Sequence, residues 1–207
     1  MVLYTPGRTS SYPDEPIASG IRIHFLGGGD EVGNVGVIIE DQTQTRILID
    51  YGLAPTSPPR YPSESPYVTD AIFTHAHIDH IGMAPWLVGN HQTKLHATPL
   101  TSALSRIMWK DTYKVSSIEG YPLPWDRRDE DEANQSWETH SFNQWVQHKS
   151  WKWQLHPAGH IPGASMIEIE TPNYKILHTG DMDTRNSPNT IGATPVNCDI
   201  LLLESTY

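Results

Sequence analysis

One hexapeptide, His75-Ala76-His77-Ile78-Asp79-His80, constrains this chain more than any other feature of its sequence. The segment before it, Ala71–Thr74, is short and apolar and is predicted to be a β-strand. The segment after it, Ile81–Leu87, is predicted to begin a helix. A turn at the end of a strand can direct alternating residues to one point. We therefore expect His75 and His77 to share one face, with Asp79 and His80 reaching a second point.

The residue types of this motif favour a metal centre. Neutral imidazole suits zinc and other borderline metals, and a carboxylate can bridge two ions. Two adjacent cations can polarise a phosphoryl or acyl centre and supply hydroxide near neutral pH. A single histidine is more often a packed or surface residue, and the chain contains 11 of them. Chance clustering in a polar loop is the alternative, but four such side chains directly after an apolar strand favour metal binding.

Composition limits the classes of protein that fit. A chain of 207 residues can form one domain with a substantial core. The 14 Lys and Arg residues face 24 acids, a formal charge of −10, which excludes a broad basic surface for nucleic acid. A nucleic-acid enzyme whose cleft gains positive charge from bound metal stays compatible with this charge. The single cysteine, Cys198, excludes an intramolecular disulfide and is interpreted as a buried thiol in a reducing interior.

The N-terminal part of the chain is predicted to be rich in strands. Residues 1–20 are interpreted as an extension. Strands are predicted over residues 21–26, 35–40 and 45–50. The glycine-rich segment Gly27–Asn34 between the first two can bring backbone N–H groups close to a phosphate, or it can be a tight turn. Of these two interpretations we favour the first, in which Gly27–Asn34 forms a loop at the rim of the site. The absence of a leader or an apolar run of membrane-spanning length predicts a cytoplasmic protein without a membrane partner.

The middle of the chain is predicted to cover a sheet. From Leu100 onward, apolar residues at helical spacing predict an amphipathic helix that includes Leu104, Ile107, Met108 and Val115. Residues 119–139 lose this periodicity and carry the acidic run 129–132, which is typical of a solvated loop. The tryptophans between 137 and 153 indicate strands and core packing, with an RNA-stacking platform as the minority reading. His91 and His96 are expected to be surface residues.

Four further residues lie where predicted strands end. Asp50 follows the apolar run 47–49 and is either a turn acid or a partner that orients metal-binding histidines. His160 lies in a turn after the strand 152–155 and is a candidate third ligand, whereas His156 is treated as structural. Asp181 follows the strand 175–178 and could bridge two ions. Glu204 comes at the end of a predicted buried strand, 200–203.

The order of these features resembles the metallo-β-lactamase superfamily. Within it, the chain resembles the β-CASP ribonucleases, which include the nuclease subunit of the cleavage and polyadenylation specificity factor, its archaeal relatives and the bacterial RNase J group. The matching segments are 27–33, 47–52, 73–85, 158–164, 179–181 and 204–207. The last of these discriminates most, because in β-CASP nucleases it leads into the inserted β-CASP domain.

The resemblance implies an α/β fold, an αββα sandwich with two zinc ions between strand-end loops. The first zinc would be held by His75, His77, His160 and Asp181, and the second by Asp79, His80 and the bridging Asp181. Asp79, Asp181 and Glu204 would act in catalysis, with Glu204 pairing with a histidine that is the general acid. Asp50 would support the metal ligands from behind.

The resemblance covers only the N-terminal portion of such an enzyme. Residues 1–20 would be an extension and 21–207 the first part of the metallo-β-lactamase domain, without the β-CASP domain and the closing segment. The sandwich and the second zinc site would then be incomplete, and activity low. Asn34 also stands where relatives often carry arginine. The implied partners are RNA, the absent half in the same or another chain, and a second copy in a homodimer.

The function implied is a zinc-dependent ribonuclease that hydrolyses RNA phosphodiester bonds in mRNA 3′-end processing or RNA decay. Two alternatives use the same ligands. One is a small-molecule hydrolase of the glyoxalase or thioesterase type, which needs no β-CASP lead-in. The other is a non-catalytic metal-binding pseudo-nuclease that positions RNA or a partner. The sequence does not indicate which residues bind substrate.

Overall fold

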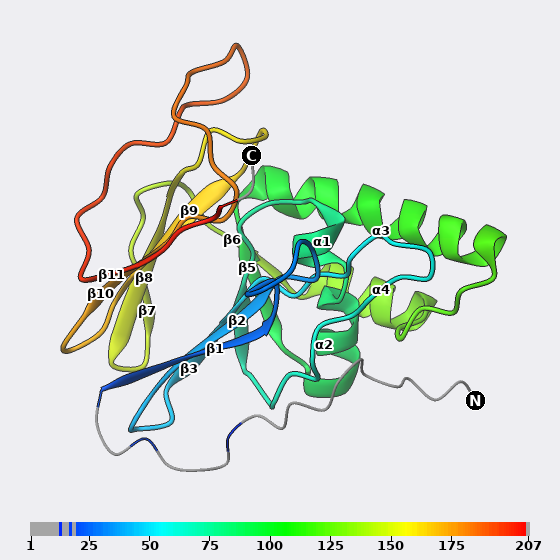
Figure 1. Ribbon diagram of the computed structural model, residues 1–207, viewed down its shortest axis with the longest axis horizontal. Helices are drawn as coiled ribbons and strands as arrows, with labels where there is room; N and C mark the ends of the chain where they lie inside the picture. Colours follow the sequence, from blue (N-terminus) through cyan, green and yellow to red (C-terminus); the bar gives the residue numbers. More distant parts are fainter. Residues whose placement is uncertain (1–12, 14–16, 18–19, 206–207) are drawn as a thin grey trace.

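The computed structural model describes residue 13, residue 17 and residues 20–205. Two β-sheets lie face to face, and the helices cover the outer side of the first sheet (Figure 1). This arrangement confirms the predicted α/β class and supplies three layers of the expected sandwich. Within the described ranges, no helix covers the outer side of the second sheet. Most of the predicted extension 1–20 lies outside the described residues, as do positions 206 and 207.

The first sheet has the strand order β1-β2-β3-β4-β5-β6 and the second β11-β10-β9-β8-β7. The strands of the first sheet are β1 (Ile21–Gly27), β2 (Gly36–Asp41), β3 (Arg46–Ile49), β4 (Asp70–Ile72), β5 (Lys94–Ala97) and β6 (Trp137–Thr139). Those of the second are β7 (Val146–His148), β8 (Trp151–Pro157), β9 (Ser165–Glu170), β10 (Lys175–His178) and β11 (Ile200–Leu202). The helices are α1 (Ile78–Ile81), α2 (Ala84–His91), α3 (Pro99–Glu119) and α4 (Arg127–Gln135).

Residues of β2 and β3 alternate between two separate cores. Ile38 and Leu48 pack toward the helices, in a cluster with Trp86 and Trp109. Their neighbours Val37, Ile39, Ile47 and Ile49 face the second sheet and pack with Trp151, Trp153 and Ile167. Successive side chains of a strand point to opposite faces, so a strand between two apolar layers is buried on both. This double burial makes β2 and β3 a rigid base for the loops at their ends.

The direction of the strands decides where those loops meet. Strands β3, β4, β5 and β6 run parallel, with Ile49 paired to Ile72 and Ile72 to His96. The carboxyl ends of β3 and β4 therefore lie at one edge of the sheet, and the backbone N–H of Asp50 donates to Ile72 O at 3.0 Å. This edge brings Asp50 next to the histidine motif, although 24 residues separate Asp50 from Thr74.

The helices differ from prediction in two places. The helix expected after the motif begins within it, because Asp79 and His80 form the first turn of α1. The long amphipathic helix is confirmed as α3, but its orientation is partly wrong. Leu104 and Met108 pack on the core as predicted, whereas Ile107 and Val115 are 63% and 48% exposed. The buried side of α3 carries the small polar residues Thr101, Ser102 and Ser105. The one large side chain on this side is Trp109.

The solvated loop predicted over 119–139 is also wrong, because it contains helix α4. Asp126 caps this helix by accepting from the backbone N–H of Asp129, and Asp129 accepts in return from the N–H of Asp126. Such a reciprocal cap satisfies N–H groups that the first turn leaves free. Arg128 and Glu132, four residues apart, add an ion pair on the surface. Local capping, charge pairing and the burial of Ala133 in the core, rather than a broad apolar face, account for this helix.

Four burial predictions change. His91, expected on the surface, is half-buried against Tyr67 and Trp86. His96, expected on the surface, is buried, because β5 lies between β4 and β6 and its side chain faces Trp153. Cys198, expected to be buried, is half-buried. Strand β11 is half-exposed rather than buried, since it forms the edge of the second sheet. No helix within the described ranges is long and apolar enough to cross a membrane.

A buried acid in the second sheet gives a first testable prediction. Glu168 Oε2 accepts from His156 and Gln154, and Glu168 Oε1 lies 3.1 Å from Lys175 Nζ. Burial raises the pKa of Glu168, but these hydrogen bonds outweigh it and hold the pKa below its usual value. The stabilisation is therefore present above the ordinary carboxyl pKa and is lost as the pH falls. We expect Glu168→Ala to reduce stability at neutral pH by about 1–3 kcal/mol.

Urea unfolding at neutral and acidic pH checks this prediction. The difference between Glu168→Ala and the unmodified chain should shrink toward acid. Glu119→Ala, at the exposed end of α3, is the control and should change stability little at either pH. A pH-independent loss would show that packing alone explains the effect.

Candidate metal centre

The histidine motif is held by the backbone of the segment that follows β3. Tyr51 N donates to His80 O at 2.7 Å, and Leu53 N donates to Ile78 O at 3.1 Å. In return, Met83 N donates to Tyr51 O at 2.8 Å. Gly52 lies at the closest approach, where a Cβ would come within 1.7 Å of Asp79 O. Only glycine fits there, so the sequence Tyr51-Gly52 fixes the position of α1 against the end of β3.

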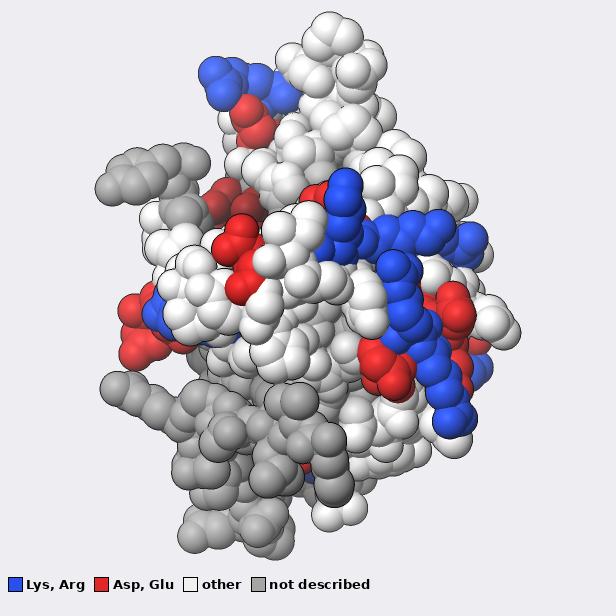
Figure 2. All heavy atoms as spheres, turned by 90° about the vertical axis from the view of Figure 1, so that its right-hand side faces the viewer, with Lys and Arg blue, Asp and Glu red and all other residues white. Residues whose placement is uncertain are grey.

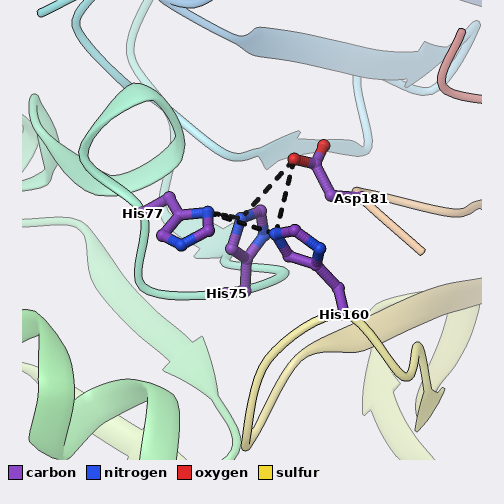
Figure 3. Close-up of side chains that lie close together, drawn as sticks. All are labelled: His75, His77, His160 and Asp181. Carbon is purple, nitrogen blue, oxygen red and sulfur yellow. Dashed lines mark hydrogen bonds and ion pairs between the residues drawn. The ribbon is translucent and has the colours of Figure 1, made fainter. Parts of the chain in front are cut away.

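Four predicted ligands converge, as Figure 3 shows, from three separate segments of the chain. His75 and His77 come from the segment after β4, His160 from the loop after β8, and Asp181 from the loop after β10. One ligand atom from each residue lies within 4.8 Å of all the others. The structure therefore brings these four side chains together at one point, as predicted.

The separations within this cluster match the donor set of a tetrahedral metal. His77 Nδ1 lies 3.0 Å from His75 Nε2 and 3.2 Å from His160 Nε2. Asp181 Oδ2 lies 3.7 Å from His160 Nε2 and 3.9 Å from His75 Nε2. Tetrahedral zinc with nitrogen ligands at about 2.1 Å would separate neighbouring ligand atoms by about 3.4 Å. Three imidazoles and one carboxylate at these distances are compatible with an ion of the zinc type.

Asp181 also faces a second group of ligands. Its other oxygen, Oδ1, lies 3.4 Å from His80 Nε2, and Asp79 Oδ2 lies 4.0 Å from the same nitrogen. Asp181 thus stands between the first cluster and the pair Asp79 and His80. A carboxylate with one oxygen on each side is the arrangement that a bridging ligand requires.

Asp50 lies behind both groups of ligands and orients His80 directly and His75 through Thr74. Its carboxylate is fully buried and accepts from Thr74 N at 2.8 Å and from His80 Nδ1 at 2.7 Å. Thr74 Oγ1 donates to Asp50 at 2.7 Å and lies 3.0 Å from His75 Nδ1. Both histidines therefore use Nδ1 for support and turn Nε2 toward the centre. Ligand histidines are commonly held this way, and the contact fixes the orientation of their rings.

The protonation states of these groups differ with their neighbours. Burial, together with neighbouring His80, His77 and His160, lowers the pKa of His75 well below its ordinary value, so its Nε2 lone pair is free. Burial lowers the pKa of His80, but the Asp50 carboxylate and Asp181 outweigh it and raise that pKa to about 10. Burial raises the pKa of Asp181, but the hydrogen bond with His80 outweighs it, so the net shift is downward. Asp181 is therefore an anion ready to bind a cation.

Comparison with known proteins gives this geometry a family. The profile of the metallo-beta-lactamase superfamily matches residues 28–194. The chain belongs to this superfamily. It shares 33% identity with the protein called Probable RNase MJ4 of Methanocaldococcus jannaschii, over 90% of this chain and 46% of that protein. It shares 31% identity with cleavage and polyadenylation specificity factor subunit 3 of Dictyostelium discoideum, over 90% of this chain and 26% of that protein.

These relatives confirm the resemblance to the β-CASP ribonucleases. The chain spans less than half the length of each of the two. Solved structures agree on the fold alone. A protein of unknown function from Enterococcus faecalis V583 matches with a TM-score of 0.56 at 18% identity, covering 81% of this chain and 44% of that one. A B3 metallo-beta-lactamase with an active-site glutamic acid matches with a TM-score of 0.53 at 13% identity, covering 84% and 65%.

In this metallo-beta-lactamase domain a cleft of 590 Å³ opens beside Asp79, His80 and Asp181. The glycine-rich loop 27–33 lines it, which confirms the prediction of a rim loop rather than a turn remote from the site. Among the residues that the structure describes, the lining includes five acids and no lysine or arginine; the acids are Asp30, Glu31, Asp79, Asp181 and Glu204. A cleft of this charge would repel a phosphate group unless a bound cation offsets it.

Glu204 lies at the cleft but is bound to the backbone. Its Oε1 accepts from Met182 N at 2.8 Å, and its own N–H donates to Thr179 Oγ1 at 3.1 Å. Glu204 therefore holds the loop that presents Asp181. The catalytic role that the resemblance implies for Glu204 stays a prediction. His178, which sequence reasoning missed, is buried beneath the same loop and accepts from Gly180 N at 3.0 Å. A lone histidine within an apolar strand gave no signal of this position.

The face that carries the ends of α3 and α4 has no uniform charge. Figure 2 shows lysine and arginine side chains beside acidic ones on this face. Arg127 pairs with Glu130 at 3.2 Å and Arg128 with Glu132 at 2.9 Å. Each of these two arginines is therefore partly neutralised by an acid one turn further along α4.

Proposed function

We propose that this domain is the metal-binding part of a ribonuclease that hydrolyses RNA phosphodiester bonds with two zinc ions. The observation that carries the proposal is the convergence of His75, His77, His160 and Asp181. The names of the relatives as a ribonuclease and a cleavage factor support RNA as the substrate. The first ion would bind these four residues, and the second would bind Asp79, His80 and Asp181.

The residues of the chain divide the work between binding and positioning. Bound zinc would supply Lewis acidity toward a phosphoryl oxygen and a hydroxide nucleophile near neutral pH. Asp50 and Thr74 hold the imidazoles in one orientation, and Glu204 holds the loop of Asp181. The backbone of loop 27–33 lines the cleft beside Asp79, where its N–H groups could contact the phosphate chain of an RNA. The acids of the cleft would exclude RNA from a metal-free site.

Two other functions use the same ligands. A thioesterase of the glyoxalase type would bind a small acyl substrate in the same cleft. A pseudo-nuclease would bind metal and RNA without turnover. The open glycine loop and the matching ribonuclease relatives favour the nuclease over both.

A parallel assay separates the three functions. The chain is loaded with zinc and incubated with a labelled RNA and, separately, with a thioester. We expect cleavage of the RNA only. His77→Ala should lose bound zinc, as measured by elemental analysis, and lose cleavage with it, because His77 Nδ1 is the ligand atom nearest to two others. His91→Ala removes a half-buried imidazole outside the centre and should retain both the bound zinc and the RNA cleavage.

Each alternative predicts a different result in this assay. Thioester hydrolysis without RNA cleavage would identify the small-molecule hydrolase. Zinc and RNA binding without any turnover would identify the pseudo-nuclease. Because the matched relatives are more than twice as long as this chain, we propose that cleavage is slow here and that zinc content is the first readout. Unchanged zinc content in His77→Ala would contradict the centre itself.

A further inference from the structure

A second group of metal-binding side chains lies at the edge of the first sheet, apart from the residues of the centre. His96 on β5 and Glu138 on β6 are paired in register, so their side chains stand side by side on one face. His140 follows β6 directly, and its backbone N–H donates to Ala97 O at 2.9 Å. The sheet itself therefore brings these three side chains together.

Their ligand atoms have the spacing of a coordination site. His96 Nδ1 lies 3.1 Å from His140 Nε2 and 3.9 Å from Glu138 Oε2. All three atoms lie within 4.8 Å of one another. His96 is buried, whereas Glu138 and His140 reach the surface, so an ion could enter from solvent. Lys94 Nζ lies 2.8 Å from the other oxygen of Glu138, Oε1, which leaves Oε2 directed at the imidazoles.

Asp70 gives this group the same support that Asp50 gives the centre. His96 Nε2 lies 2.9 Å from Asp70 Oδ1, so Nε2 carries the proton and Nδ1 presents a lone pair to His140. Thr69 Oγ1 donates to the other oxygen of Asp70 at 2.6 Å. A carboxylate behind a histidine that faces other ligands is the arrangement found around bound zinc. A surface histidine pair formed by chance would not need this fixed tautomer.

We propose that His96, Glu138 and His140 form a second, independent site for a transition-metal ion of the zinc type. Two imidazoles and one carboxylate suit such an ion, and a water molecule would complete a tetrahedral set. The site differs from the centre in its strands, since it uses β5 and β6 rather than the ends of β3, β4, β8 and β10. It does not depend on the proposed ribonuclease function.

The site would connect the two sheets. The rings of His96 and His140 both contact Trp153 of β8, with centroid separations of 5.4 and 4.9 Å. A metal bound here would fix edge strand β6 to β5 and to the face of the second sheet. An ion that binds only the folded state stabilises it by RT ln(1 + [L]/Kd), so the melting temperature rises with the concentration of added metal. The bound ion would therefore stabilise the edge strand β6 against the rest of the sheet.

Zinc stoichiometry tests the proposal. Equilibrium dialysis of the full chain against zinc should give one equivalent fewer for His140→Ala than for the unmodified chain. His91→Ala, which removes an imidazole outside both groups, should bind as much zinc as the unmodified chain. The melting temperature should rise with added zinc by less in His140→Ala than in His91→Ala. Glu138→Gln is a second variant that keeps both imidazoles and side-chain size, and it should weaken binding at least tenfold.

A local readout distinguishes this site from the centre. Cobalt(II) quenches nearby indole fluorescence, so cobalt should quench the part of the emission that Trp153→Phe removes. Loss of that quenching in His140→Ala or Glu138→Gln supports the site. Equal stoichiometry and equal quenching in His140→Ala, Glu138→Gln, His91→Ala and the unmodified chain would overturn it and leave His140 and His96 as a hydrogen-bonded pair.

Discussion

A methyl group added at Gly52 is expected to destabilise this protein more than any other single change near the centre. The Cβ of Gly52→Ala would lie 1.7 Å from Asp79 O and 2.5 Å from His80 N. Both are backbone atoms, so no side chain can rotate away to relieve the contact. We expect a loss of about 4 kcal/mol or more, a large part of the stability of a domain of this size. Urea unfolding measures it.

The same substitution should weaken metal binding, because α1 carries Asp79 and His80. Moving the helix away from Tyr51 would break the hydrogen bonds to His80 O and Ile78 O. Gly120→Ala is the matched control. Gly120 has a φ of +77° and nothing within 4 Å of its Cβ, so only backbone strain of about 1 kcal/mol is expected there. An equal shift of the unfolding midpoint in both variants would show that the close approach at Gly52 does not matter.

The sequence alone located most of the centre, because its signals were local. The apolar alternation of β2 and β3 and the dense motif 75–80 are visible within short windows. The positions of His160 and Asp181 at strand ends were sufficient to predict convergence, since loops at one edge of a sandwich meet. The same reasoning could not show that Glu204 binds the backbone of Met182, because this contact depends on the path of a loop 22 residues away.

The features that sequence reasoning missed depend on contacts between strands. His96 was expected on the surface because it and His91 flank a polar stretch of the chain. Its burial follows from the position of β5 between two strands and from Trp153 on the opposite sheet. Helix α4 lacks an apolar stripe, and only Ala133 and the paired Glu130 are buried in it. The cap between Asp126 and Asp129 was the available signal for that helix, and an acidic run concealed it.

The second large effect is expected at Asp50. Asp50→Ala removes three hydrogen-bond contacts, two from Thr74 and one from His80, at a position without solvent access. The imidazole of His80 would lose its partner inside the protein. Removing one partner of a buried charged pair costs about 3–5 kcal/mol. Loss of a carboxylate that orients ligands lowers metal affinity about 10–100-fold. We expect both effects together in Asp50→Ala.

Asp50→Asn separates the two effects. Its amide oxygen can still accept from Thr74 N, so the fold should persist with a smaller loss of stability. Its NH₂ group would then take the place of Oδ2 and face both His80 Nδ1 and Thr74 Oγ1, which disrupts the support of His80 and His75. Zinc affinity, measured by competition with a chelator, should therefore fall about tenfold or more even where the protein remains folded.

Asp41→Asn controls for the loss of a buried acid as such. Asp41 is also buried at a strand end, where it accepts from Thr43 and from Trp151 Nε1. It touches none of the ligand histidines, so Asp41→Asn should lose stability and keep its zinc affinity. If Asp50→Asn and Asp41→Asn bound zinc equally well, the orientation of His75 and His80 by Asp50 would have no role in metal binding. If only Asp50→Asn is impaired, the carboxylate behind the histidines is part of the centre.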